Sequence, residues 1–286
     1  MDTVKEERKY QMLDGILIID KPAGITSHDV VAKVRRALKT KRVGHTGTLD
    51  PLATGVLVVC VEKATKLVNY LTCDEKTYEV EMKFGIKTDT GDITGKIIDE
   101  DTNYDIDMNK IKRTLDKFIG KQEQIPPMYS AIKVNGKKLY ELAREGIEIE
   151  REARKIEIFE IKNIEWKDET LKYTVHCSKG TYIRSLCEDI AGELGTIGTM
   201  TNLRRIQSGE FQVKDAIKIE DISEKKIISI EKLFDKEIDV KNNLKELLNG
   251  MKIQCIRPDG LYKLYADKFI GIGKIEKNYL KREIIL

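Results

Sequence analysis

One carboxylate stands alone in a loop whose residues suit it for chemistry. Asp50 lies in the segment Gly44–Gly55, which reads GHTGTLDPLATG. The glycines allow the backbone to approach a ligand closely, and Pro51 favours an extended conformation at Asp50. No other acidic residue occurs from Val30 to Val61. The segment therefore predicts an aspartate presented to a substrate, although an aspartate that begins a turn before proline would have the same sequence.

Positive charge is concentrated just upstream of this loop. Residues 21–42 contain seven Lys or Arg residues and one acidic residue, so their net charge is +6, whereas the whole chain carries +3. The basic residues are Lys21, Lys33, Arg35, Arg36, Lys39, Lys41 and Arg42. Such a concentration suits the binding of phosphate groups and hence of nucleic acid. A solvated helix face is the alternative.

The elements that position the loop follow from hydrophobic spacing. Residues 15–22 form an apolar run that predicts a short strand, and residues 56–61 predict a buried strand directly after the loop. Between them, apolar residues at helical spacing predict a helix that Thr26 or Ser27 caps and that Gly44 ends. These apolar residues are Val30, Val31, Val34, Ala37 and Leu38. The opposite face of this helix carries Lys33, Arg36 and Lys39.

Two further segments bring candidate residues from later in the chain. Alternation over residues 77–85 predicts a strand with Tyr78 on its buried face, where one end of the ring could line a cleft. Residues 183–194 predict a helix with Tyr182 and Arg184 at its start. An arginine is unfavourable near a helix N-terminus, so we expect Arg184 to have a partner outside the helix.

Residues 126–146 predict a compact protrusion. Asn135-Gly136 is a strong hairpin signal, and residues 137–145 read as a helix that Gly146 ends. The segment carries four basic residues, which are Lys133, Lys137, Lys138 and Arg144. It is either a surface excursion or a nucleic-acid clamp.

Composition limits the class of protein. The chain has 286 residues, of which 41% are hydrophobic and 35% charged, so it suits one large domain with or without a small appendage. No apolar run reaches the roughly 20 residues that a membrane span needs, and we expect a cytosolic protein. Five scattered cysteines and three distant histidines predict neither a disulfide framework nor a metal site. Residues 88–92 lack the ligand pattern of a calcium loop and predict a turn.

The pattern of predicted elements changes beyond about Ile230. Short strand candidates at residues 252–256, 261–265 and 269–275 are separated by turn residues, which predicts a small appended β module. We expect a large domain at residues 1–236, which includes the 126–146 protrusion, and a module at residues 237–286.

Four motifs in this order resemble the TruB family, the tRNA pseudouridine-55 synthases. They are the D-K-P-x-G-x-T-S of residues 20–27, the Gly44–Gly55 segment, residues 129–146 and the K-G-T-Y-I-R of residues 179–184. The resemblance extends from about Leu13 to about Val213. The C-terminal module looks like a short PUA-type RNA-binding module.

The resemblance implies a fold, a reaction and a set of site residues. The fold would be a mixed α/β (α+β) domain around a largely antiparallel sheet, and the reaction would isomerise a T-loop uridine of tRNA to pseudouridine on a flipped-out base. Asp50 would be the catalytic aspartate, with Arg184 as its partner and Tyr78 stacked on the base. His45 would help to open the T-loop. The residues that would line the pocket are Lys21, Tyr182 and Leu203.

The expected partner is the T-arm of tRNA, held by basic residues of the helix and the protrusion. These are Lys33, Arg35, Arg36, Lys39, Lys133, Lys137 and Arg144. An isomerisation is redox-neutral, so no metal or small-molecule cofactor is expected. We also expect no membrane and no obligate protein partner. An arginine next to a carboxylate favours its ionised form, as a nucleophile or base requires.

Other functions remain to be weighed. A tRNA-binding folding chaperone would use the same surfaces, but it would gain nothing evident from the Asp50 carboxylate. The catalytic subunit of a guide-RNA-dependent pseudouridylase is a second alternative. An aspartyl-phosphate phosphatase would need another acid near Asp50 to hold Mg²⁺, and the sequence offers none nearby. Whether Asp50 attacks C1′, attacks C6 or abstracts a 2′ proton stays open.

Overall fold

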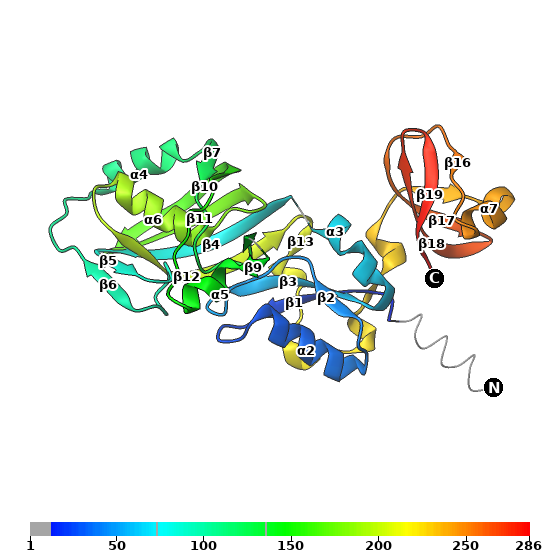
Figure 1. Cartoon of the computed structure of the whole chain (residues 1–286), viewed down its shortest axis with the longest axis horizontal. Helices are drawn as coiled ribbons and strands as arrows, with labels where there is room; N and C mark the ends of the chain where they lie inside the picture. Colours follow the sequence, from blue (N-terminus) through cyan, green and yellow to red (C-terminus); the bar gives the residue numbers. More distant parts are fainter. Residues whose placement is uncertain (1–12, 73, 135) are drawn as a thin grey trace.

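A ten-stranded mixed sheet runs through the large domain (Figure 1). The structure is a computed structural model and describes residues 13–72, 74–134 and 136–286. Along the sheet the order is β14 (Ile228–Ser229), β1 (Gly15–Lys21), β3 (Thr54–Val61), β12 (Gly198–Ser208), β4 (Glu75–Phe84), β11 (Thr170–Ser178), β10 (Arg154–Lys167) and β7 (Gly120–Gln124). In addition, β2 (Val43–His45) pairs with β3, and β13 (Phe211–Gln212) pairs with β12. Among the described strand pairs of this sheet only β3–β12 is parallel, which confirms the predicted mixed, largely antiparallel sheet.

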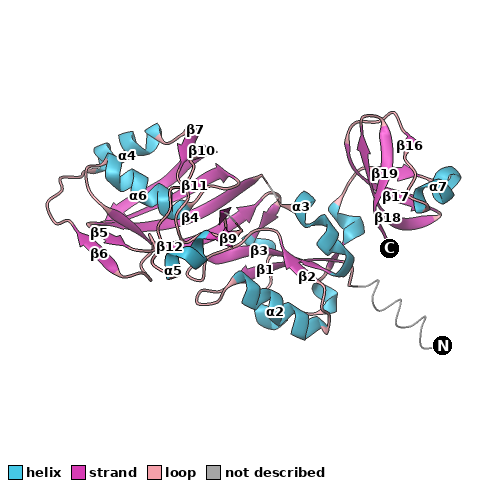
Figure 2. Ribbon diagram, viewed as in Figure 1, coloured by secondary structure: helices cyan, strands magenta, loops and turns pink. Residues whose placement is uncertain are grey.

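Helices cover the two halves of the sheet separately (Figure 2). One half packs against α4 (Met108–Lys117) and α6 (Ile183–Glu193), whose apolar residues share a core with β4, β11 and β12. The other half, β1 and β3, packs against α2 (Ser27–Leu38). The parallel β3–β12 pair joins the halves, so a residue on either strand can contact elements of both.

Helix α2 begins as predicted and ends differently. The Thr26 side chain accepts a hydrogen bond from the backbone N–H of Asp29, and the Asp29 carboxylate accepts one from the backbone N–H of Thr26. The prediction that Gly44 ends the helix was wrong. Lys39 ends it in the left-handed conformation, with φ of 52°, and Gly44 lies inside β2. Ala37, predicted on the apolar face, is exposed.

Short elements complete the large domain. After β3 the chain forms a 3-10 turn, η1 (Glu62–Leu67), followed by α3 (Val68–Leu71). The protrusion contains β8 (Lys133–Val134), β9 (Lys137–Lys138) and α5 (Leu139–Arg144). Strands β8 and β9 pair as the predicted hairpin, although Asn135 of the turn lies outside the described residues. The segment around residues 88–92 is the predicted turn, and it follows β5 (Ile86–Thr88), which pairs with β6 (Ile97–Glu100).

A second sheet forms the C-terminal part of the chain. Its order is β15 (Glu237–Asp239), β17 (Gly260–Ala266), β18 (Lys268–Glu276), β19 (Tyr279–Ile285) and β16 (Ile253–Gln254), with α7 (Leu244–Leu248) beside it. The sequence-based prediction missed β15 and β19. Five 3-10 turns lead into and through this part: η2 (Val213–Asp215), η3 (Ile219–Asp221), η4 (Glu224–Lys226), η5 (Ile230–Leu233) and η6 (Lys241–Asn243).

The second sheet packs directly onto the first. Ile272 of β18 and Ile284 of β19 are buried in the same core as Ile16 of β1 and Val58 of β3. Burial of apolar surface stabilises by about 25 cal/mol per Å², so this shared core fixes the C-terminal sheet against the large one. In the described ranges, no helix combines the length and the apolar character that a membrane crossing requires.

Candidate active site

A buried lysine holds the backbone of the loop directly after Asp50. Lys21 is fully buried at the end of β1, and its ammonium donates hydrogen bonds to three backbone carbonyl oxygens. These are the oxygens of Pro22 at 3.0 Å, Pro51 at 3.3 Å and Ala53 at 2.6 Å. Burial lowers the Lys21 pKa to about 8, while the negative charge of Asp50 acts in the opposite direction. Lys21 thus lies within electrostatic reach of Asp50 as well as holding its loop.

The start of α2 holds the other side of the loop. The Ser27 hydroxyl accepts a hydrogen bond from the Leu49 backbone N–H at 2.9 Å and lies 3.1 Å from the Leu49 carbonyl oxygen. The Asp50 carbonyl oxygen accepts a bond from the Ala53 N–H at 3.1 Å, which closes a turn. Asp50 does begin a turn before Pro51, and that turn leaves the carboxylate one-third exposed, with 34% of its side chain accessible.

Arg184 connects this carboxylate to the rest of the domain. Its Nε lies 2.9 Å from Asp50 Oδ2, and only 5% of its side chain is exposed. Its two terminal nitrogens donate to the carbonyl oxygens of Thr90 and Tyr129, each at 2.8 Å. The predicted partner outside the helix is therefore Asp50, and Arg184 also ties the loop after β5 to the protrusion.

Two tyrosines approach the same place. Tyr78 on β4 is 7% exposed, and burial raises the pKa of its phenol. Tyr182 precedes α6, and Gln124 of β7 fixes its backbone by accepting a hydrogen bond from its N–H and donating one to its carbonyl oxygen. Burial raises the Tyr182 pKa too, and the charge of Asp50 contributes to both shifts. The structure thus groups both tyrosines with Asp50.

Leu203 and His45 lie near this group with different surroundings. Leu203 of β12 is buried and pairs in register with Val80, two residues along β4 from Tyr78. His45 ends β2, and its ring meets that of His28 edge-on with centroids 5.4 Å apart. Burial, followed by the positive charge of His28, lowers the His45 pKa. Its Nδ1 atom is buried and makes no hydrogen bond within the described part of the chain.

The predicted basic residues lie on two exposed surfaces. Lys33, Arg35, Arg36 and Lys39 are exposed along α2, and Arg35 also donates to the Val43 carbonyl oxygen at 3.1 Å. A helix rises 1.5 Å per residue, so Lys33 and Lys39 lie about 9 and 18 Å along the axis from Ser27. The basic part of α2 is therefore set apart from the carboxylate.

The protrusion carries the second basic surface. Lys133, Lys137 and Arg144 are all exposed. Lys137 is 3.9 Å from Glu145, and the Arg144 guanidinium lies 5.5 Å from the centre of the Tyr140 ring. These contacts are at the surface, so the three cations remain accessible to a ligand.

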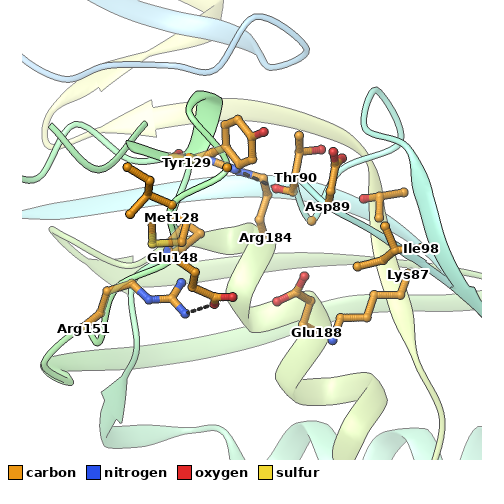
Figure 3. A pocket seen from close by; sticks show the side chains of 16 residues that line it. Lys87, Asp89, Thr90, Ile98, Met128, Tyr129, Glu148, Arg151, Arg184 and Glu188 are labelled. Atoms are coloured by element: carbon orange, nitrogen blue, oxygen red, sulfur yellow. Dashed lines mark hydrogen bonds and ion pairs between the residues drawn. The ribbon is translucent and has the colours of Figure 1, made fainter. Parts of the chain in front are cut away.

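A cavity of about 480 Å³ adjoins the ion pair (Figure 3). Its lining comes from the β5–β6 segment, the protrusion and α6, and Arg184 forms part of its wall. Figure 3 shows Glu188 of α6 beside Lys87, and Arg151 paired with Glu148 on the other side. Burial raises the Glu188 pKa. Asp50 does not line this cavity, so the cavity is a neighbour of the ion pair rather than its container.

The sequence-based prediction missed one residue, Arg205 of β12. Its side chain is buried and donates to the carbonyl oxygens of Gly47 and Val56. Leu203 and Arg205 are two residues apart on one strand and so share a face. Because Leu203 was expected in the pocket, that spacing would have placed Arg205 there too.

The assembled site offers a carboxylate paired with a buried cation, with two tyrosines within electrostatic reach. Such a group can act as a nucleophile or base on a planar substrate. Among the described residues, no group of three or more His, Cys, Asp and Glu side chains is arranged to hold a metal ion.

Comparisons with known proteins agree with one another over most of the chain. The family model "TruB family pseudouridylate synthase (N terminal domain)" matches residues 35–183. The model "tRNA pseudouridylate synthase B C-terminal domain" matches residues 184–252.

Curated relatives include tRNA pseudouridine synthase B of Clostridium perfringens, which is 46% identical over 96% of this chain and 99% of the relative. The enzyme of the same name from Clostridium kluyveri is 46% identical over 91% of this chain and 95% of its own length. Among solved structures, a Cbf5-Nop10-Gar1 complex has a chain that is 26% identical, with a TM-score of 0.70, over 96% of this chain and 85% of the other.

Proposed function

The chain belongs to the TruB family of pseudouridylate synthases and isomerises uridine in tRNA to pseudouridine, and on this premise we propose that its target is the T-loop uridine at position 55. The single observation that carries the site assignment is the Asp50–Arg184 ion pair at 2.9 Å. It places one accessible carboxylate between the loop before β3 and the start of α6. A binding chaperone has no use for this pair.

The reaction defines what Asp50 must do. The bond between N1 and C1′ breaks, a bond between C5 and C1′ forms, C5 loses a proton and N1 gains one. Each proposed route, attack at C1′, attack at C6 or abstraction of the 2′ proton, requires an ionised carboxylate held at a fixed place. Lys21 fixes the backbone after Asp50, Ser27 fixes Leu49 before it, and Arg184 orients one carboxylate oxygen.

The tyrosines supply the binding of the flipped base. Extruding a base from its stack costs a few kcal/mol, and stacking on an aromatic ring returns about 1–3 kcal/mol. We assign stacking to Tyr78, which β4 presents next to Asp50, and we assign the edge of the pocket to Tyr182 and Leu203. His45 would meet the T-loop at the mouth of the site.

The surfaces that would hold the T-arm are the exposed faces of α2 and of the protrusion. Their basic residues suit phosphate contacts, which supply most of the sequence-independent affinity for RNA. We further propose that residues 237–286 form a PUA-like module that adds a second RNA contact to the domain of residues 1–236, and that the enzyme acts in the cytosol. A guide-RNA-dependent role is not favoured, because the relatives at 46% identity are tRNA enzymes over nearly their whole length.

Asp50→Asn tests the assignment. The amide keeps the shape of the side chain but cannot act as a nucleophile or base, so we expect no pseudouridine formation on a tRNA transcript and nearly unchanged tRNA binding. Asp105→Asn is the matched control, because that carboxylate is 93% exposed and distant in sequence. Chemical mapping of pseudouridine identifies the position. Substantial turnover by Asp50→Asn would refute the role of Asp50, and product at another position would refute the proposed target.

A further inference from the structure

Arg205 is a buried cation that the reaction described above does not use. Only 2% of its surface is exposed. In the described part of the chain it takes part in no ion pair with a carboxylate, whereas its neighbour Arg204 pairs with Asp20 at 2.8 Å. Burying a charge without an opposite charge is costly unless hydrogen bonds compensate it. Burying this charge costs stability, which points to a role at the site.

The position of Arg205 in the sheet is central. In register, Arg205 faces Gly55 on the parallel strand β3 and Tyr78 on the antiparallel strand β4. Gly55 has φ of 99°, and a Cβ atom added there would lie 2.2 Å from the Arg205 carbonyl oxygen. The two backbones therefore touch, and Arg205 stands where the two halves of the sheet meet.

Its guanidinium joins two parts of the site. The Nε atom donates to the Val56 carbonyl oxygen at 2.8 Å, and one terminal nitrogen donates to the Gly47 carbonyl oxygen at 3.0 Å. Arg205 also pairs in register with Tyr78, and its positive charge acts on the Tyr78 phenol against the effect of burial on the pKa. Gly47 lies three residues before Asp50, so one rigid group contacts the catalytic loop from a strand position directly opposite the tyrosine.

We propose that Arg205 is a positioning residue that sets the Tyr78 ring against the Asp50 loop. This inference rests on the proposed roles of Tyr78 and Asp50. The planar guanidinium donates in several fixed directions at once, which a lysine ammonium on a flexible stem does not reproduce. Because the residue that pairs with Tyr78 also holds the Gly47 carbonyl oxygen, a base stacked on Tyr78 is held at a fixed distance from the carboxylate.

Arg205→Lys separates positioning from charge. It keeps the cation in the same strand but cannot reproduce the fixed geometry by which the guanidinium contacts the two carbonyl oxygens beside Tyr78. A misplacement of about 1 Å costs about 100-fold in rate. We expect the single-turnover rate constant on tRNA to fall by about 10- to 100-fold, and the tRNA dissociation constant to change by less than about 3-fold. Arg204→Lys, one residue away, is the matched control and should stay within about 3-fold of wild type in both.

A double-mutant cycle with Tyr78→Phe provides the decisive readout. Phenylalanine keeps the ring but removes the phenolic hydroxyl, on which the Arg205 charge acts. If Arg205 acts through Tyr78, the Arg205→Lys loss is at least about 5-fold smaller in the Tyr78→Phe background, since coupled residues are not additive. Thermal unfolding of each variant gives its folded fraction.

The possible outcomes are distinct. The positioning role would be overturned if the lower rate constant of Arg205→Lys were fully explained by its lower folded fraction. It would also be overturned if Arg205→Lys caused the same loss of rate in the wild-type background as in the Tyr78→Phe background. If wild type itself forms no pseudouridine at position 55, the proposed function fails instead. A loss in rate with coupling to Tyr78 supports the inference.

Discussion

Replacing Arg184 with methionine tests how the site holds its carboxylate. The substitution removes the ion pair with Asp50 Oδ2 and the hydrogen bonds to the Thr90 and Tyr129 carbonyl oxygens. Methionine is long, unbranched and flexible, so it can occupy much of the volume that the arginine fills. The main change is therefore in polar interactions rather than in packing.

The expected loss of stability follows from these interactions. Removing one partner of a fully buried pair costs about 3–5 kcal/mol. Asp50 is 34% exposed, so water can solvate the remaining carboxylate and the pair contributes less, about 1–2 kcal/mol. The two carbonyl oxygens add about 1 kcal/mol each. We expect Arg184→Met to lower the free energy of unfolding by about 3–4 kcal/mol, which an ordinary stability of about 5–15 kcal/mol tolerates.

Two assays separate stability from catalysis. Urea unfolding of wild type, Arg184→Met, Asp50→Asn and the double variant gives the coupling free energy between the two side chains. Release of the hydrogen label from C5 of uridine reports catalysis, because formation of the C5–C1′ bond expels that proton. At saturating tRNA and with the protein folded, we expect Arg184→Met to lose at least about 100-fold in rate.

Arg184→Lys is the control that restores charge without the fixed geometry of the guanidinium. We expect it to recover part of the stability and little of the rate. A coupling free energy below about 0.3 kcal/mol, within the usual error of additivity, would show that the ion pair contributes nothing to folding. Arg184→Met activity within about 3-fold of wild type would refute the reasoning about catalysis.

Two further predictions concern Lys21 and the basic face of α2. The Lys21 pKa is about 8 in the folded protein and 10.5 in the unfolded chain, so the unfolded chain binds more protons between these two pH values. The stability of wild type should therefore rise relative to that of Lys21→Met from about pH 8 to about pH 10.5. Urea unfolding across this range would show a constant difference in stability if the pKa shift were absent. Changing Arg35, Arg36 and Lys39 to glutamine should weaken tRNA binding and reduce the slope of log K against log salt by about 1 for each phosphate that is no longer neutralised. The same change at Lys110, Lys112 and Arg113 of α4 is the control, and equal slopes for the two variants would show that the α2 face is merely solvated.

Local patterns predicted the elements that carry the site. The Thr26 cap and the alternation around Tyr78 depend on neighbours within a few residues, so the sequence contains them. The expectation of a partner for Arg184 follows from its unfavourable place near a helix N-terminus, which the sequence also shows. The end of α2 did not follow, because Lys39 adopts a left-handed conformation that glycine more commonly takes.

The residues that the sequence-based prediction missed depend on pairing between distant strands. In the sequence, Arg204 and Arg205 resemble two exposed basic residues. Only the position of β12 between β3 and β4 shows that Arg205 is buried. Strand β19 was missed because its charged centre, Lys281 to Glu283, interrupts the apolar pattern, and its pairing with β18 is what makes it a strand. Such pairings are set by the tertiary fold, which overrides local propensity.

The parallel pairing of β3 with β12 also bears on how the enzyme becomes active as it folds. Arg205 reaches across 149 residues to Val56 and 158 residues to Gly47, so its hydrogen bonds join segments that are far apart in sequence. Interactions of this separation carry a high entropy of loop closure and form slowly. The first half of the chain, although it holds Asp50, Lys21 and Tyr78, would remain inert until β12 is inserted. Recovery of activity during refolding would therefore report the final closure of the sheet rather than the formation of its parts.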